Sequence, residues 1–125
     1  MTDERWARGS AMFTEVTGMA APNRGDDYVA DVVIDQVFAE IWTRPGLTRK
    51  ERRWIAITCA CWAGAPFAME THIGAALRSG DITMEERREF VVHFAAYAGH
   101  PKATAARSAL DTATNRLAPP EEGTR

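Results

Sequence analysis

The chain has 125 residues, of which 46% are apolar and 26% charged, and its net charge is −2. This composition is typical of one globular domain, and a near-neutral charge excludes a general field that would recruit nucleic acid or an anionic membrane. No apolar run approaches the roughly 20 residues that span a bilayer, and the first residues, MTDERWARGS, are charged where a signal peptide is apolar. We therefore expect a cytoplasmic protein whose partner is a small molecule or a second copy of the chain.

Helical periodicity runs through every segment between turn residues, and no segment alternates like a half-buried strand. The chain is therefore predicted to be all-α. The first helix is predicted from Asp3 to Val16, and the second from Asp26 or Asp27 to the RPGL segment at 44–47. An inward-facing apolar stripe is predicted on this second helix, made of Val29, Val33, Val37 and Ile41 and widened by Val32, Phe38 and Trp42.

Two capping boxes mark further helix starts. Thr48 is followed three residues later by Glu51, and Thr83 by Glu86. In each pair the threonine hydroxyl can accept a hydrogen bond from a backbone amide of the first helical turn. The glutamate carboxylate can accept one from the backbone amide of the threonine. Helices are therefore predicted to begin at Arg49 and just after Thr83.

Glycine and proline divide the rest of the chain. Pro66 suits the first position of a helix that Gly80 ends, and Gly99 with Pro101 separates a fifth helix from a sixth that runs to about residue 117. This gives six helices in a single domain over residues 1–118, followed by a disordered tail over 119–125.

One histidine lies on an apolar stripe of the fourth helix, in the segment APFAMETHIGAAL. Met69, His72, Ile73 and Ala76 follow the i, i+3, i+4, i+7 spacing of one helix face. His72 is therefore predicted to face the core. Glu70 lies about 200° round the helix from this face, given 100° for each residue.

A second histidine lies on a similar stripe of the fifth helix, where the same spacing selects Phe90, His93, Phe94 and Tyr97. The short turn SGDIT joins the two helices, which predicts an antiparallel hairpin. Both histidines lie roughly 12 to 15 Å from that turn at the α-helical rise, so we expect them at similar height in one groove. The alternative is that each imidazole is a core residue, hydrogen-bonded to a backbone carbonyl or a hydroxyl.

Cysteines and charged turns carry no further site. Cys59 and Cys61 point to nearly opposite sides of a helix and are interpreted as two small buried residues. Neither histidine is followed by a second histidine or an acid at i+3 or i+4 on its own face, so no metal site is predicted. The segment TRKERRW is interpreted as a solvated first turn that carries Arg52 and Arg53.

Three segments resemble a known family: RGSAMFTEVTG, EIWTRPGLTRKERRWIAIT and, most specifically, THIGAALRSGDITMEERREFVVHFAAYAGHPKA. They are similar to the carboxymuconolactone decarboxylase family, part of a larger group that includes the alkyl hydroperoxidase D type of protein. The resemblance covers most of the chain. It implies a six-helix alkyl hydroperoxidase D-like domain with a core antiparallel hairpin, assembled as a trimer or hexamer.

The redox branch of that group carries Cys-x-x-Cys-x-x-x-His and a glutamate on the preceding helix. Counted back from His72, the two cysteine positions hold Ala65 and Ala68, and the glutamate position falls on Arg53. A dithiol peroxidase needs one thiolate to attack and a second to resolve the product, so no thiol peroxidase activity is expected. The decarboxylase branch lacks these cysteines as well.

The resemblance therefore implies decarboxylation, without a cofactor, of a small carboxylated lactone or ring acid. His72 and His93 are the candidate catalytic residues. The candidate substrate-binding residues are Trp42, Arg44, Glu70 and Tyr97. Family decarboxylases commonly have an acidic residue at the position of Ala68, which leaves the substrate open. The alternative function is a non-catalytic oligomer of the same fold that binds a small ligand or has a structural role.

Overall fold

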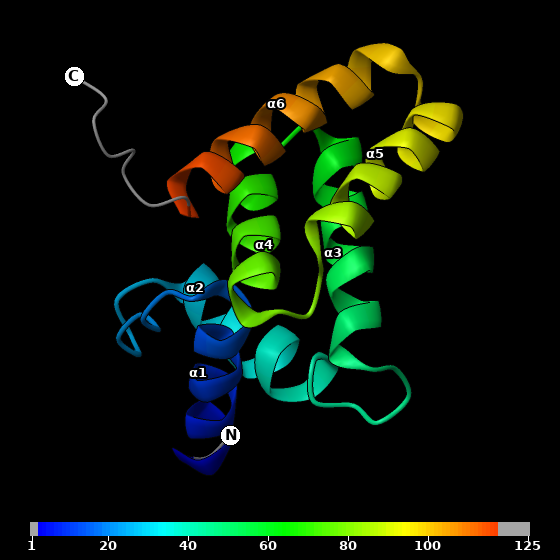
Figure 1. The fold of residues 1–125 in the computed structure, drawn as a ribbon. Coiled ribbons are helices and arrows are strands. Elements are labelled where there is room, and N and C mark those ends of the chain that lie inside the picture. Colours follow the sequence, from blue (N-terminus) through cyan, green and yellow to red (C-terminus); the bar gives the residue numbers. More distant parts are fainter. Residues whose placement is uncertain (1–2, 118–125) are drawn as a thin grey trace, which may run out of the picture. The chain divides into compact units, whose positions relative to one another are not determined.

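A computed structural model describes residues 3–117, and every regular element in that range is a helix (Figure 1). The elements are α1 (Asp3–Thr17), α2 (Tyr28–Val32), η1 (Val33–Ile41), α3 (Arg49–Ala63), α4 (Pro66–Ser79), α5 (Met84–Ala98) and α6 (His100–Leu117). Because α2 continues directly into η1, they form one helical segment, and the prediction of an all-α chain with six such segments is confirmed within residues 3–117. The predicted tail, 119–125, lies outside the described residues.

The chain forms two compact units, the first ending at Arg53 and the second beginning at Trp54. The boundary falls inside α3. Helices α1, α2 and η1 belong to the first unit, and α4, α5 and α6 to the second. No helix within residues 3–117 has the length and apolar character needed to cross a membrane.

Both predicted capping boxes are present. At the start of α3, the Glu51 amide donates to the Thr48 hydroxyl at 3.1 Å, and the Thr48 amide donates to the Glu51 carboxylate at 2.8 Å. At the start of α5, Thr83 and Glu86 form the same pair of hydrogen bonds at 3.1 and 2.9 Å. These bonds satisfy amides that the first helical turn leaves without intrahelical partners.

The other helix ends also follow the local signals. The Asp27 carboxylate accepts from the Val29 amide at 3.0 Å and begins α2. Pro66 is the first residue of α4, and Gly80 ends that helix with φ 82°, a left-handed conformation that favours glycine.

The inward face of the second helical segment differs from the predicted one. Ile34, Phe38 and Ala39 are buried, whereas Val29 is 68% exposed. The predicted stripe of Val29, Val33, Val37 and Ile41 is therefore wrong as an inner face, although Phe38 on its margin is buried. The helix is apolar on both sides, so periodicity alone does not identify the side that packs.

The π-helical geometry of η1 adds to this difference. Its hydrogen bonds span five residues, as between the Trp42 amide and the Val37 carbonyl at 3.0 Å. Successive side chains are then rotated away from the positions that the α-helical period assigns them.

Close contact between α1 and η1 builds the core of the first unit. A Cβ at Gly9 would lie 2.2 Å from the backbone oxygen of Ile34, so no other residue fits there without moving the helices apart. One turn further along α1, Phe13 packs edge-on against Phe38, with ring centroids 5.1 Å apart.

Arg53 is the largest side chain with no solvent exposure. Its Nη1 donates to the Val16 carbonyl at 2.9 Å and its Nη2 to the Glu15 carbonyl at 3.2 Å. Both carbonyls lie in the last turn of α1, where they lack intrahelical partners and where the helix dipole favours a cation. The prediction that Arg53 lies in a solvated turn is therefore wrong, because its charge caps α1.

Small residues allow close packing in the second unit. The α4 residues Gly74, Ala75 and Ala76 are buried, and α6 packs closely against α4. The buried residues of α6 are Ala103, Ala106, Ala109, Leu110 and Ala113. Helices α4 and α5 follow each other across the turn at 80–83, and the closely packed helix pairs of this unit are α4 with α6 and α5 with α6 (Figure 1).

Replacing Arg53 with methionine should lower the free energy of unfolding by about 2 to 4 kcal/mol, because two carbonyls at the end of α1 lose their donors. The matched control is Arg49→Met, which removes the ion pair with Glu15 at 2.8 Å between side chains that are 40% and 56% exposed. That exposed pair should contribute less than about 1 kcal/mol. Urea denaturation measures both variants, and equal losses would contradict a capping role for Arg53.

Candidate functional site

His72 occupies the predicted face of α4. Its neighbours on this stripe, Met69 and Ile73, are buried, and His72 itself is half-buried with its Nδ1 atom shielded from solvent. The dielectric constant around such an imidazole is lower than in water, so the hydrogen bonds that it makes are electrostatically stronger. The prediction that His72 lies on the core-facing stripe is confirmed.

His93 lies on an outer face of α5. It is exposed and stacks on Tyr97, with ring centroids 5.3 Å apart and planes 12° apart, and Tyr97 is 84% exposed. The predicted inward position is therefore wrong for both residues, although Phe94 of the same stripe is buried. The second half of α5, residues 90–98, is apolar on almost every side, so the spacing does not select a single inner face.

A shallow hollow of about 300 Å³ lies beside His93. It is lined by Trp54, Glu86, Glu89, Phe90 and His93. Trp54 from α3 stacks on Phe90 at 5.2 Å and forms an aromatic wall, while the two glutamates belong to the first turns of α5. His72 is not among the lining residues, so this hollow does not bring the two histidines together.

Of the residues that line this hollow, His93 was predicted as a site residue and Phe90 was placed on the same stripe, whereas Trp54 and Glu89 were not predicted. Trp54 is five residues beyond the start of α3, and nothing in its local pattern indicates that it meets α5. The signal in the sequence is that Trp54 and Phe90 are large aromatic residues, a type that is common in ligand sites.

The candidate substrate-binding residues are spread over the chain. The Glu70 carboxylate is paired with the Arg116 guanidinium at 2.6 Å, which links α4 to α6. Trp42 is half-buried and stacks on Phe38 with centroids 6.0 Å apart. Arg44 is exposed, and its carbonyl accepts from Arg52 at 3.0 Å. Tyr97 alone contacts one of the two histidines in a described ring pair.

The two cysteines differ from each other. Cys61 is buried and burial raises the pKa of its thiol from 9.0 to about 11, whereas Cys59 is exposed. The interpretation of both as buried residues is therefore wrong for Cys59. Both are free thiols. Within residues 3–117 no three histidine, cysteine or acidic side chains gather as a metal-binding group.

A family model and two relatives that match this chain all carry the name of a decarboxylase. The family model described as "Carboxymuconolactone decarboxylase family" matches residues 29–112, a range that crosses the boundary between the two units. A 4-carboxymuconolactone decarboxylase from Acinetobacter baylyi is 32% identical over 114 residues, which cover 85% of this chain and 84% of that protein. A nitrosuccinic acid decarboxylase from Metarhizium robertsii is 31% identical over 71 residues, or 57% of this chain and 49% of that protein.

Iodoacetamide at about pH 8 should modify Cys59 and spare Cys61, because the thiolate is the reactive form and a buried thiol with a raised pKa stays protonated. The raised pKa also predicts a stability effect. The neutral Cys61 thiol adds stability that is complete below pH 9 and is lost as the pH rises towards 11.

Intact-protein mass spectrometry checks the first expectation and denaturation from pH 8.5 to 11 the second. Cys61→Ala should lose less stability over this range than the wild-type protein, and Cys59→Ser is the matched control. Rapid double alkylation of the folded chain would contradict the burial of Cys61.

Proposed function

The chain belongs to the carboxymuconolactone decarboxylase family, and from this premise we propose that it is a carboxy-lyase acting on a small carboxylated lactone or ring acid. The observation that carries the proposal is the 32% identity to a 4-carboxymuconolactone decarboxylase over 85% of the chain. The second relative is also named as a decarboxylase, of a different acid. Removal of carbon dioxide is thus the chemistry that the two names share.

The proposed reaction needs an electron sink and a proton donor. When the carbon–carboxylate bond breaks, carbon dioxide leaves and its bonding electron pair moves through the conjugated system into the ring carbonyl. The resulting dienolate then takes one proton at carbon. The protein must stabilise the developing negative charge and deliver that proton, and the substrate carbonyl itself accepts the electrons.

His72 is the proposed principal acid–base residue. Its half-buried position among Met69 and Ile73 limits its contact with water, and an imidazole is the side chain that most often serves as a general acid or base. Such a group can donate a hydrogen bond to the carbonyl oxygen or a proton to carbon. Partial exclusion of water also favours loss of a substrate carboxylate.

His93 is the proposed second residue of the reaction. Trp54 and Phe90 provide an apolar wall against which a flat ring can stack, and His93 lies at the same hollow. Tyr97, stacked on His93, restricts the orientation of the imidazole. Trp42, Arg44 and Glu70 remain predicted substrate contacts.

The alternative function is a non-catalytic oligomer that binds a small ligand. The exposure of His93 and Tyr97 favours it, because an exposed aromatic pair is also typical of an interface. Under this alternative His72 has a structural role in the packing of α4.

Self-association belongs to the proposal under either function. Several large apolar side chains are more than half exposed and line neither the hollow beside His93 nor a second hollow between α5 and α6, namely Tyr28, Val29, Ile55, Trp62, Phe67 and Tyr97. Exposed large apolar side chains are common at interfaces between copies of a chain, and most soluble oligomers are symmetric homo-oligomers. A trimer or hexamer is the proposed state.

Sedimentation equilibrium at micromolar concentration should therefore give a species of three or six chains, each of 13.8 kDa. The mass should persist at about 1 M salt, since salt screens surface charges but does not weaken apolar contacts. A stable species with the mass of one chain would contradict the proposed assembly.

His72→Ala should lower the turnover of 4-carboxymuconolactone by about 100-fold or more, the scale of a lost acid–base group. The helix should survive, because alanine is the best helix former. His93→Gln should lower the rate more than the melting temperature, since glutamine keeps a hydrogen-bond donor but does not titrate.

The matched control is His100→Gln, which alters an exposed histidine at the start of α6. Steady-state kinetics and thermal melting are measured on all three variants. Unchanged turnover combined with a lower melting temperature for His72→Ala would favour the non-catalytic alternative.

A further inference from the structure

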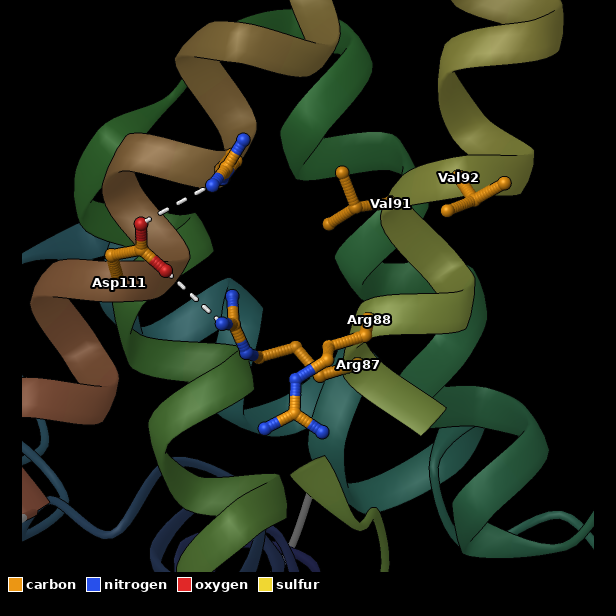
Figure 2. Close-up of a pocket in the computed structure, with 6 residues that line it drawn as sticks. Arg87, Arg88, Val91, Val92 and Asp111 are labelled. Carbon is orange, nitrogen blue, oxygen red and sulfur yellow. Dashed lines mark hydrogen bonds and ion pairs between the residues drawn. The ribbon is translucent and has the colours of Figure 1, made fainter. Parts of the chain in front are cut away.

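A second hollow lies between α5 and α6, and it shares no lining residue with the hollow beside His93. Its volume is about 260 Å³, and it is lined by Arg87, Arg88, Val91, Val92, Arg107 and Asp111 (Figure 2). Three arginines and one aspartate leave a formal excess of two positive charges at this place, in a chain whose net charge is −2. The hollow therefore attracts anions.

Arg87 is the buried member of this group. Its side chain is only 10% exposed and reaches from α5 towards Asp111 on α6 (Figure 2). Its Nη2 donates to the Asp111 carboxylate at 3.0 Å. Its Nε and Nη1 atoms are buried and make no hydrogen bond to any described residue. Buried charged donors without acceptors are unfavourable, so this guanidinium has unused capacity to bind an oxyanion.

Asp111 does not balance the charge around it. Its second carboxylate oxygen lies 4.0 Å from Nε of Arg107, so one carboxylate is shared between two guanidinium groups. Arg88 adds a third positive charge at the hollow. A second carboxylate would bring the local charge closer to neutrality and would supply acceptors in the geometry that guanidinium groups prefer.

The apolar part of the hollow distinguishes an organic acid from a simple inorganic anion. Val91 and Val92 line this hollow and also an adjoining one of about 290 Å³, which continues along α5 and α6 to Ala95 and Ala103. A ligand with a carboxylate at Arg87 can therefore lay an apolar body along the valines, where burial of its surface contributes further affinity.

From this geometry we infer that the hollow between α5 and α6 is a separate binding site for the carboxylate of a small organic acid with an apolar body. The inference concerns binding alone and does not rest on the proposed decarboxylase activity. It uses a face of α5 different from the face that carries His93.

Calorimetric titration of the whole protein with benzoate tests this site, with benzyl alcohol and inorganic phosphate as comparison probes. Benzoate should bind saturably, benzyl alcohol should not bind because it lacks the charge, and phosphate should bind more weakly because it lacks the ring. Equal affinity for benzyl alcohol or for phosphate would overturn the assignment to an organic acid.

Two substitutions should move benzoate affinity in opposite directions. Arg87→Gln should weaken binding by about tenfold or more, since hydrogen bonds to a charged group are lost. Asp111→Asn should strengthen it, because the competing carboxylate is removed while the side chain keeps its size. The matched control is Arg78→Gln, which removes an exposed arginine of α4 that does not line the hollow and should leave affinity unchanged.

Asp111→Asn keeps the test decisive if Arg87→Gln fails to fold. If the Arg87–Asp111 pair were purely structural, Asp111→Asn would lower the stability of the protein and would not raise its affinity for benzoate. The titration is repeated on His72→Ala, where binding should persist. Loss of turnover with retained benzoate binding separates this site from the proposed reaction. Absence of benzoate binding, or affinity that neither substitution changes, would overturn the inference.

Discussion

The fold of the first unit depends on the burial of one charged side chain, Arg53, which has no exposure to solvent. Arg53 can be buried only if its donors meet acceptors, and the acceptors are the Glu15 and Val16 carbonyls at the end of α1. The first turn of α3 must therefore lie against that end. The contact between Gly9 and Ile34 then sets how closely η1 approaches α1.

The same arginine bears on the chemistry of the site. Within the wider group that the sequence resembles, this position corresponds to the glutamate of the redox branch, and Ala65 and Ala68 occupy the cysteine positions. A guanidinium engaged with two helix carbonyls has no part in relaying protons, and alanines have no thiol chemistry. His72 is the residue of that arrangement that keeps a titratable side chain, which agrees with the membership of the chain in a decarboxylase family.

Helix α5 serves two different surfaces of the second unit. Phe90 and His93 line an aromatic hollow with Trp54, while Arg87, Val91 and Val92 line a cationic one with residues of α6. The buried alanines of α6 let this helix pack closely against α4 and α5. An apolar helix with charges in its first turns can in this way present two kinds of binding surface to solvent.

The sequence by itself determined the local structure, because helix starts and ends depend on residues a few positions apart. Thr48, Thr83, Pro66 and Gly80 are examples, since their caps form as the local chemistry requires. The family and the inward face of His72 were also readable. The tertiary structure alone decided the burial of Arg53, the outward position of His93 and the meeting of Trp54 with Phe90. These depend on which of several apolar faces finds a partner, and a helical period contains no information about the partner.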